Sequence, residues 1–184
     1  MTRVFLALGS NVGNRRENLR MALAYLSRHI RIVAVSSLYR SEAVVVPGDA
    51  PGPDFFNAVC EVDTDLPPEA LLSFVKAVEH EIGRRPAGRW APRPIDIDIL
   101  LYGDHMVDSD SLMIPHPLLH ERTFVLVPLA ELAPDLVHPR LHIQMSQLAD
   151  ELDFTGLAHI EGPESVESSD GSFDTDDNVR WNDA

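Results

Sequence analysis

The sequence predicts an α+β fold in which helices pack on an antiparallel sheet. The 184-residue chain is 45% hydrophobic and 24% charged, the composition of an ordinary globular protein with enough length to bury one core. Its apolar segments switch between the alternation typical of strands and the three- and four-residue spacing typical of helices. The switches follow the order β-α-β-β-α-β, which is the split βαβ or ferredoxin-like pattern with two helices on one face of the sheet.

The first half of this pattern lies in the first fifty-odd residues. Residues 3–8 are an apolar run that is expected to form a buried strand, and the turn GSNVGN follows it. Apolar positions keep helical spacing over residues 15–26, and Asn14 suits the N-cap. Residues 30–39 are β-branched and roughly alternating, so they predict a second strand. The prolines and glycines of residues 41–53 predict a long mobile loop.

A third strand and a second helix follow this loop. Residues 55–63, FFNAVCEVD, alternate as a strand does. Pro67-Pro68 predicts the start of a helix that continues to about Ile82 and ends at Gly83. The alternation of the third strand sends Phe56, Ala58, Cys60 and Val62 to one face of the sheet and Phe55, Asn57 and Val59 to the other.

The last core strand is predicted at residues 95–101, IDIDILL. After Asp104 the sequence indicates loops and short C-terminal helices, the clearest of them at residues 145–152. We therefore expect one domain over residues 1–160, followed by a tail over residues 161–184.

The tail differs from the domain in composition. Residues 161–184 hold eight acidic residues against one arginine, together with several serines and glycines. Such a segment buries too little apolar surface to fold, so we expect it to be disordered. It either serves as a solvated tail that aids solubility or docks on a partner through Phe173 and Trp181.

Composition also excludes several classes of protein. A formal net charge of −14 argues against nucleic-acid binding, because nucleic-acid binders are usually basic. No apolar run approaches the length of a membrane span, and the N-terminus has no signal-peptide pattern. Cys60 is the single cysteine, which excludes a disulfide framework and fits a reducing compartment. We expect a cytoplasmic monomer that contacts no membrane and no nucleic acid.

The strongest chemical feature is the pair Asp96 and Asp98. Residues i and i+2 of a strand face the same side, so both carboxylates project together while Ile95, Ile97 and Ile99 enter the core. Two neighbouring carboxylates repel each other unless a positive charge lies between them, and oxygen ligands of this kind suit Mg²⁺. By itself, the D-x-D pattern is more typical of two solvent-facing charges on a half-exposed strand.

An arginine-rich segment precedes the acidic pair. Residues 84–93, RRPAGRWAPR, contain no acidic residue, and their prolines stiffen the loop. Arginine suits bidentate phosphate recognition, and Trp90 offers a flat face for a planar ring. The alternative is a basic surface loop, but arginines that lead directly into a carboxylate pair favour a polyphosphate–Mg²⁺ site. The arginines are Arg84, Arg85, Arg89 and Arg93.

Two further residues add to this site, whereas common nucleotide motifs are missing. His116 after Pro115 supplies a titratable donor, and Arg122 supplies another guanidinium. The sequence contains neither a G-x-x-x-x-G-K-[ST] phosphate loop nor a kinase-type lysine signature. The turn GSNVGN only loosely resembles a phosphate loop, and a tight strand-to-helix connection explains it equally well.

These motifs together resemble the 6-hydroxymethyl-7,8-dihydropterin pyrophosphokinases of folate biosynthesis, over roughly residues 3–158. The family signature R-W-x-P-R-x-[LI]-D-[LI]-D-[IL]-x-[LF]-[YF]-G matches residues 89–103 throughout. Five other marks occur in the same order: ALGSN at 7–11, the SxxYR-type strand end at 36–40, FxNAV at 55–59, E-x-x-x-G-R at 79–84, and PH…R-x-F at Pro115, His116, Arg122 and Phe124.

The resemblance implies that pyrophosphate is transferred from ATP, the co-substrate, to the hydroxymethyl group of the dihydropterin, with release of AMP. It implies two Mg²⁺ ions bound by Asp96 and Asp98, and a catalytic set of Arg84, Arg93, Asp96, Asp98 and His116. The implied ATP-binding residues are Arg84, Trp90, Arg93, Ile99, His116 and Arg122. The implied pterin-binding residues are Ser41, Glu42, Val44, Phe55, Asn57, Trp90, Asp96 and Phe124, with the ring stacked between Phe55 and Phe124 and Trp90 closing over the site.

The sequence departs from the family pattern at several positions. Pro117 stands where members often have Tyr, and Phe55 stands where some have Tyr. Lys76 lies where some members have Gln near the adenine, and Glu42 with the three valines at 44–46 replaces a proline-rich stretch. These differences affect individual ligand contacts rather than the implied reaction.

Two other classes of protein compete with this interpretation. Nucleotidyltransferases also combine a Gly-Ser turn with a D-x-D strand, but there the acids follow within about a dozen residues, whereas Asp96 lies far from Gly9-Ser10 here. A non-catalytic ferredoxin-like binding module has no need for arginines beside a metal-competent acid pair. Release of AMP rather than pyrophosphate would distinguish a pyrophosphokinase from a nucleotidyltransferase. Turnover of ATP would distinguish it from a non-catalytic binding module.

Overall fold

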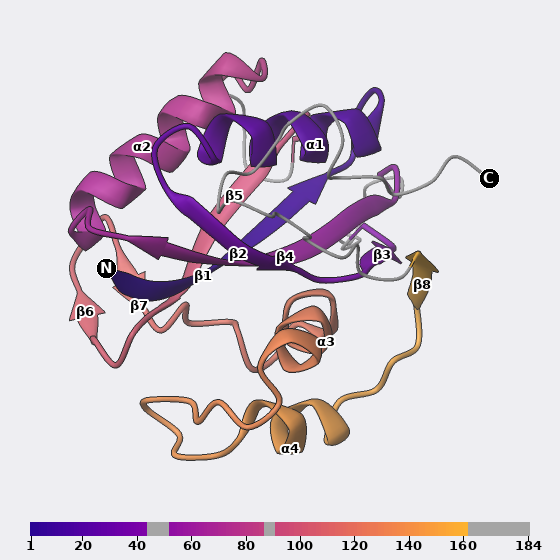
Figure 1. The fold of residues 1–184 in the computed structure, drawn as a ribbon. Helices are drawn as coiled ribbons and strands as arrows, with labels where there is room; N and C mark the ends of the chain where they lie inside the picture. The colour runs from indigo at the N-terminus through magenta and orange to yellow at the C-terminus, as the bar shows by residue number, and fades with distance from the viewer. Residues whose placement is uncertain (44–51, 87–90, 162–184) are drawn as a thin grey trace, which may run out of the picture.

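A computed structural model describes residues 1–43, 52–86 and 91–161. One sheet of six strands dominates it, in the order β5-β1-β4-β3-β8 with β2 also paired to β4 (Figure 1). Its strands are β1 (Thr2–Ser10), β2 (Arg31–Val35), β3 (Leu38–Ser41), β4 (Phe55–Thr64), β5 (Asp96–Tyr102) and β8 (Leu157–Glu161), and all pair antiparallel. A separate ribbon joins β6 (Val107–Asp108) to β7 (Met113–Ile114). The predicted α+β, ferredoxin-like arrangement is confirmed.

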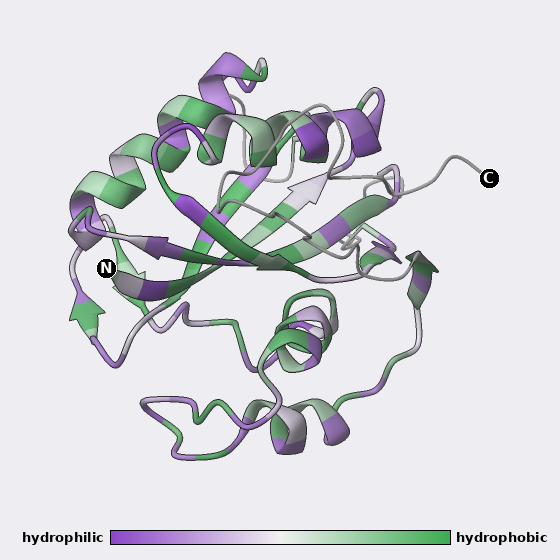
Figure 2. Cartoon of the chain, viewed as in Figure 1, coloured by the Kyte–Doolittle hydropathy of each residue, from purple (hydrophilic) through white to green (hydrophobic). Residues whose placement is uncertain are grey.

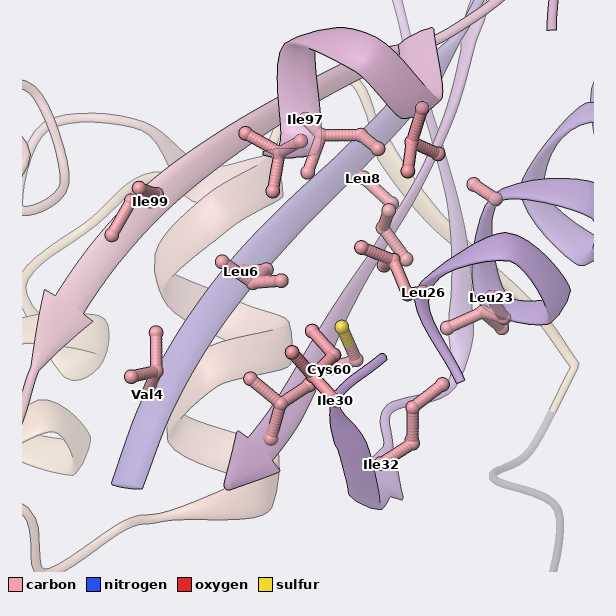
Figure 3. Close-up of a cluster of buried hydrophobic side chains, with 14 of the residues drawn as sticks. Val4, Leu6, Leu8, Leu23, Leu26, Ile30, Ile32, Cys60, Ile97 and Ile99 are labelled. Atoms are coloured by element: carbon pink, nitrogen blue, oxygen red, sulfur yellow. The ribbon is translucent and has the colours of Figure 1, made fainter. Parts of the chain in front are cut away.

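Helices cover both faces of the sheet. The helices α1 (Arg15–Leu26) and α2 (Pro68–Glu81) lie on one face, whereas α3 (Thr123–Leu132) and α4 (Met145–Asp150) lie on the other (Figure 1). Side chains of alternate residues therefore enter two separate apolar clusters, and the central strands are hydrophobic along most of their length (Figure 2). The first cluster, under α1 and α2, includes Val4, Leu6, Leu8, Leu23, Leu26, Cys60, Ile97 and Ile99 (Figure 3).

The local signals in the sequence explain both predicted helices. The Asn14 side chain accepts a hydrogen bond from the Glu17 backbone N–H and caps α1. Pro68 begins α2, where a missing N–H costs nothing, and Gly83 follows its end with a φ of 106° that favours glycine. Each predicted helix therefore begins and ends within a residue or two of the expected position.

Strand β4 alternates as predicted. Ala58, Cys60 and Val62 belong to the cluster under α1 and α2, while Val59 belongs to the one under α3 and α4. Burial raises the pKa of the Cys60 thiol to about 12, so this cysteine stays protonated and serves the packing. Phe55 and Asn57 share the face of Val59 and lie at the strand end, where they reach a cavity.

A β-bulge interrupts the alternation of β5. The β1–β5 register shifts between Phe5 and Leu6, which leaves Leu100 as an extra residue on β5. As a result, Ile99 packs under α2 whereas Leu100 packs under α3. The Leu100 carbonyl oxygen, turned out of the ladder, accepts the His116 backbone N–H at 2.9 Å. The bulge thus fixes the start of the segment that carries His116.

The structure differs from the sequence prediction in four places, one of them the β6–β7 ribbon, which lies where loops and short helices were expected. The single strand predicted at residues 30–39 is two strands, because Ser36 interrupts the ladder: its hydroxyl accepts the Val59 N–H and donates to the Ser37 carbonyl. Helix α3 was expected only as part of a region of loops and short helices. Its sequence is almost wholly apolar and contains Pro128, so it lacks the periodic spacing of apolar and polar residues that would have indicated a helix. Strand β8 was not predicted.

The boundary of the predicted domain stays a prediction. Strand β8 continues to Glu161, one residue beyond the expected limit at 160. The tail expected to be disordered, and most of the loop expected at 41–53, lie outside the described residues. Among the residues that the structure does describe, no helix is long and apolar enough to cross a membrane.

Glu131 joins α3 to the edge of the sheet. Its Oε1 accepts the backbone N–H of Ser37 at 2.9 Å and the Ser37 hydroxyl at 2.8 Å, and its Oε2 accepts the Tyr39 hydroxyl at 2.9 Å. Ser37 is buried, and burial together with Glu131 raises the pKa of Tyr39. One carboxylate thus satisfies three donors at the break between β2 and β3.

We predict that Glu131→Ala lowers the free energy of unfolding by about 1–2 kcal/mol, because the Ser37 N–H loses its acceptor in a buried position. Urea denaturation followed by circular dichroism measures this change. Glu151→Gln, at an exposed position after α4, is the control and should change stability little. Equal stability of Glu131→Ala and the parent protein would show that water replaces the carboxylate.

Candidate active site

A cavity of about 500 Å³ opens at the end of the sheet where β1 and β3 end and β4 and β5 begin. Most of the residues expected in the site line it, although they come from four separate segments. The structure thus brings together, within one cavity, the predicted residues Ser41, Glu42, Phe55, Asn57, Arg93, Asp96, Asp98, Arg122 and Phe124.

Apart from His116, the other predicted residues are in the second cavity, in the core or outside the described residues. Arg84 lines a second cavity of about 510 Å³, which Arg93 also lines. The side chain of Ile99 is buried in the core, so only its backbone is left to contact a ligand. Trp90 and Val44 lie outside the described residues.

Strand register explains why the acidic and aromatic residues share a cavity. Gly9 pairs with Asn57 on one side and with Asp96 on the other. A Cβ on Gly9 would approach Asn57 Oδ1 to 3.4 Å and the Phe55 ring to 3.7 Å, so a side chain there would occupy the cavity. Ala7, two residues earlier, pairs with Asp98. The small residues of the ALGSN motif therefore keep space open between the carboxylates and the aromatic end.

Asp96 lies between two arginines. Its Oδ1 accepts from Arg84 Nη1, and its Oδ2 accepts from Arg93 Nη1 at 2.6 Å. Burial raises the pKa of this carboxyl, but the positive charges of Arg84 and Arg93 outweigh burial, so the net pKa is lowered. Asp98 lines the same cavity from the same face of β5, as its alternation predicts.

Glu79 is a functional candidate that the sequence analysis missed. Its side chain is 3% exposed, and its Oε1 lies 2.7 Å from Lys76 Nζ, 2.6 Å from Arg84 Nη1 and 2.7 Å from the Ile97 backbone N. Burial raises the pKa of Glu79, and Lys76 and Arg84 oppose this shift. One carboxylate at the end of α2 thus fixes both Arg84 and the strand residue between Asp96 and Asp98.

Asn11 is the second residue whose role was missed. Its Oδ1 accepts the Arg93 backbone N–H at 2.8 Å, and its own N–H donates to the Arg93 carbonyl at 3.2 Å. Asn11 is 5% exposed, and the neighbouring turn is fixed by Asn18, whose amide donates to the Val12 carbonyl. The turn GSNVGN is therefore a connection that positions Arg93, although Asn11 also lines the cavity.

The other end of the cavity is aromatic and amide-lined. Phe55 and Phe124 lie in its wall, one from β4 and one from α3. The Asn57 amide donates to the Ser41 hydroxyl at 2.9 Å, which fixes the orientation of the amide and leaves its oxygen to accept from a ligand. Such a wall suits a planar ring with hydrogen-bonding groups on its edge.

His116 lies beside the acidic pair. Its Nδ1 accepts the Leu118 backbone N–H at 3.2 Å, so the neutral ring carries its proton on Nε2. Burial lowers the pKa of His116, Asp98 raises it and Arg122 lowers it again, with a net lowering. The ring is therefore neutral at pH 7, with Nε2–H available as a donor.

The comparisons with known proteins agree with this geometry. Residues 5–134 match the family model described as 7,8-dihydro-6-hydroxymethylpterin-pyrophosphokinase (HPPK). The match contains every residue of the 500 Å³ cavity. The chain belongs to this family. The predicted resemblance and the enzyme class, a pyrophosphokinase, are confirmed.

Full-length relatives support the assignment to the HPPK family. A 2-amino-4-hydroxy-6-hydroxymethyldihydropteridine pyrophosphokinase of Methylorubrum extorquens is 45% identical over 163 residues, which cover 88% of this chain and 100% of that protein. The protein of the same name from Pseudomonas aeruginosa is 42% identical over 162 residues, with 87% and 98% covered.

Other HPPK relatives are much longer than this chain. The folic acid synthesis protein FOL1 of Dictyostelium discoideum is 39% identical over 156 residues, but these are only 23% of that protein. Among solved structures, a Plasmodium falciparum HPPK-DHPS triple mutant superposes with a TM-score of 0.67 at 17% identity, covering 82% of this chain and 44% of that one. At this identity the likeness concerns the fold.

The lowered pKa of Asp96 makes a prediction for stability against pH. The unfolded chain takes up this proton near the ordinary value of 3.8, whereas the folded chain does so at lower pH. The stabilisation from the charged carboxylate is therefore complete above pH 4 to 5 and decreases as the pH falls through the folded pKa.

We predict that the difference in unfolding free energy between the parent protein and Asp96→Asn is constant from about pH 5 to pH 7 and shrinks below about pH 4. Urea titrations at several pH values measure it, with Asp104→Asn on the exposed turn after β5 as the control for loss of one charge. A difference independent of pH would contradict the lowered pKa.

Proposed function

We propose that this chain catalyses Mg²⁺-dependent transfer of pyrophosphate from ATP to the hydroxymethyl group of 6-hydroxymethyl-7,8-dihydropterin, releasing AMP. The observation that carries the proposal is the cavity with Asp96 and Asp98 on one side and Phe55, Asn57 and Phe124 on the other. Membership of the HPPK family supports the same reaction. We further propose that the protein acts as a cytoplasmic monomer, with these small molecules as its substrates.

The aromatic end supports the pterin assignment. Phe55 and Phe124 would stack on the fused ring, and Asn57 Oδ1 would accept from an N–H on its edge. Backbone groups near Ser41 and Glu42 would contact the rest of that edge. In this orientation the hydroxymethyl group would point toward the carboxylates, because Gly9 leaves free the space between Asn57 and Asp96.

The donor set of the acidic pair fits magnesium. Asp96 and Asp98 offer two carboxylates from one face of β5, and Mg²⁺ commonly takes one or two carboxylates together with phosphate oxygens and water. No group of three metal-ligating side chains occurs among the described residues, as expected where the substrate supplies the other ligands. Bound there, two Mg²⁺ ions would neutralise phosphate charge and lower the pKa of a coordinated hydroxyl.

The arginines would exchange partners when ATP binds. Arg84 and Arg93 pair with Asp96, and the phosphates of ATP would take over both guanidinium groups. Freed of the arginines, the Asp96 carboxylate would be available as a metal ligand. The same pair of arginines thus balances charge in the absence of ATP and binds phosphate in its presence.

The reaction would proceed by displacement at the β-phosphorus. The hydroxymethyl oxygen forms a bond to this phosphorus and its proton is released to solvent, while the bond from the β-phosphorus to the α–β bridging oxygen breaks and AMP leaves with that oxygen. Arg84 and Arg93 would stabilise the negative charge that develops on the bridging oxygen, and His116 Nε2–H and Arg122 would hold the nucleotide phosphates. Most of the catalysis would come from positioning and charge neutralisation.

Identification of the nucleotide product tests this reaction. With ATP, Mg²⁺ and 6-hydroxymethyl-7,8-dihydropterin we expect AMP and the pterin pyrophosphate ester in equal amounts. We predict that Asp98→Asn lowers turnover by at least about 100-fold while the fold is retained, because the acidic pair loses one charge. Release of inorganic pyrophosphate would indicate nucleotidyl transfer, and no turnover would indicate a binding module.

Substitutions of Arg93 test whether its guanidinium acts in the transition state or in ground-state binding of ATP. Arg93→Ala should lower kcat by about 100-fold or more and weaken ATP binding much less, because the guanidinium acts on charge that develops in the transition state. Arg93→Lys should rescue only a small part of kcat, since lysine lacks two-pronged geometry. Arg85→Ala, outside the ion pairs of Asp96, is the matched control. Equal losses of kcat and affinity in Arg93→Ala would assign the residue to ground-state binding.

A further inference from the structure

Two histidines that no part of the proposed mechanism uses, His120 and His138, pack edge to face. His120 lies in the turn that carries His116 and Arg122, and His138 lies in the connection between α3 and α4. Their ring centroids are 5.9 Å apart and the ring planes are nearly perpendicular, at 87°. The contact therefore joins two segments that are distant in sequence.

Each ring has one buried nitrogen without a hydrogen-bond partner among the described residues. These atoms are Nδ1 of His120 and Nε2 of His138. His138 as a whole is 3% exposed. An unpaired buried polar atom is costly, and two of them on rings in contact call for a common explanation.

The surroundings of His138 assign its proton. Its Nδ1 accepts the backbone N–H groups of Arg140 and Leu141, both at 3.2 Å, so this nitrogen carries no proton. The neutral ring must then carry its proton on the unpaired Nε2. Burial lowers the pKa of His138, and the nearby His120, Arg140 and His142 lower it further, which keeps the ring neutral.

The surroundings of His120 assign the opposite role to its unpaired nitrogen. Its Nε2 lies 3.6 Å from Glu121 Oε1, which favours the proton on Nε2. The buried Nδ1 is then an acceptor that lacks a donor. The two unpaired atoms are therefore complementary: a buried N–H on His138 and a buried lone pair on His120.

We propose that His138 Nε2–H donates to His120 Nδ1, and that this histidine pair positions the turn over residues 116–122 for nucleotide binding. Formation of this bond would require the two rings to turn from their edge-to-face arrangement. At its start the turn is held by the His116 N–H bond to the Leu100 carbonyl, and beyond that by local bonds, such as Leu119 N–H to the His116 carbonyl at 3.0 Å, and by burial of Leu119. His138 supplies a fixed point outside the turn.

The orientation of two ligand-binding residues depends on that fixed point. His116 and Arg122 flank His120 in the turn, and Arg122 is also the N-cap residue of α3. If the turn shifts, both side chains move relative to Asp98, while Phe55 and Asn57 on β4 stay in place. This inference rests on the proposed role of His116 and Arg122 in ATP binding, and it makes His120 and His138 positioning residues.

The test compares two substitutions of His120. In His120→Asn, the amide oxygen lies near the former Nδ1 and can still accept from His138, whereas His120→Leu fills similar space with no acceptor. We expect His120→Leu to weaken binding of Mg²⁺–ATP by about three- to tenfold and His120→Asn to bind within about twofold of the parent protein. Pterin affinity should be unchanged in both. His142→Asn, at an exposed site of the same connection, is the control.

Nitrogen-15 NMR of the imidazole rings provides a readout independent of activity. We expect the His138 Nε2–H proton to exchange slowly in the parent protein and in His120→Asn, and quickly in His120→Leu. A proton on His138 Nδ1, or parent-like ATP binding in His120→Leu, would overturn the inference. If His116→Ala also binds ATP like the parent protein, the proposed nucleotide site itself is wrong.

Discussion

The site depends on one strand that buries alternate residues and presents the residues between them. Ile97 and Ile99 on β5, and Ile95 directly before it, are buried under the helices, so Asp96 and Asp98 must face the other way, into the cavity. Placing two carboxylates side by side in a partly buried cavity is unfavourable unless cations compensate them. Arg84 and Arg93 supply that compensation at Asp96, and contacts from the surrounding scaffold hold these groups in place.

The scaffold holds them from three directions. Helix α2 contributes Glu79, which binds Arg84 and the backbone of Ile97. The turn after β1 contributes Asn11, which binds the backbone of Arg93 on both sides. The bulge in β5 frees a carbonyl that binds the start of the His116 segment. The contacts that position charge are therefore buried or half-buried hydrogen bonds and an ion pair to the buried Glu79, rather than fully exposed ion pairs, which contribute little.

The sequence predicted the parts of this structure that local patterns determine. Alternation on β4 and β5, the Asn14 cap and the Pro68 and Gly83 limits of α2 are short-range signals, and the structure confirms them. Strand β8 and the Asn11–Arg93 contact could not be predicted in this way, because the partners lie about 80 to 120 residues apart in the sequence and meet only through the register of the sheet. The family motif marked Asn11 and Glu79 as pattern residues, yet neither their partners nor their burial is visible in a motif.

In the proposed mechanism, Arg84 and Arg93 exchange Asp96 for phosphate when the substrates bind. A crystal structure with Mg²⁺, an ATP analogue whose α–β bridging oxygen is replaced by CH₂, and 6-hydroxymethyl-7,8-dihydropterin tests it directly. We expect oxygens of Asp96 and Asp98 to lie at about 2.0–2.1 Å from Mg²⁺. Arg84 and Arg93 should contact phosphate oxygens, and the pterin should lie between Phe55 and Phe124. Asp96 still paired with both arginines, and nucleotide bound away from the acidic pair, would contradict it.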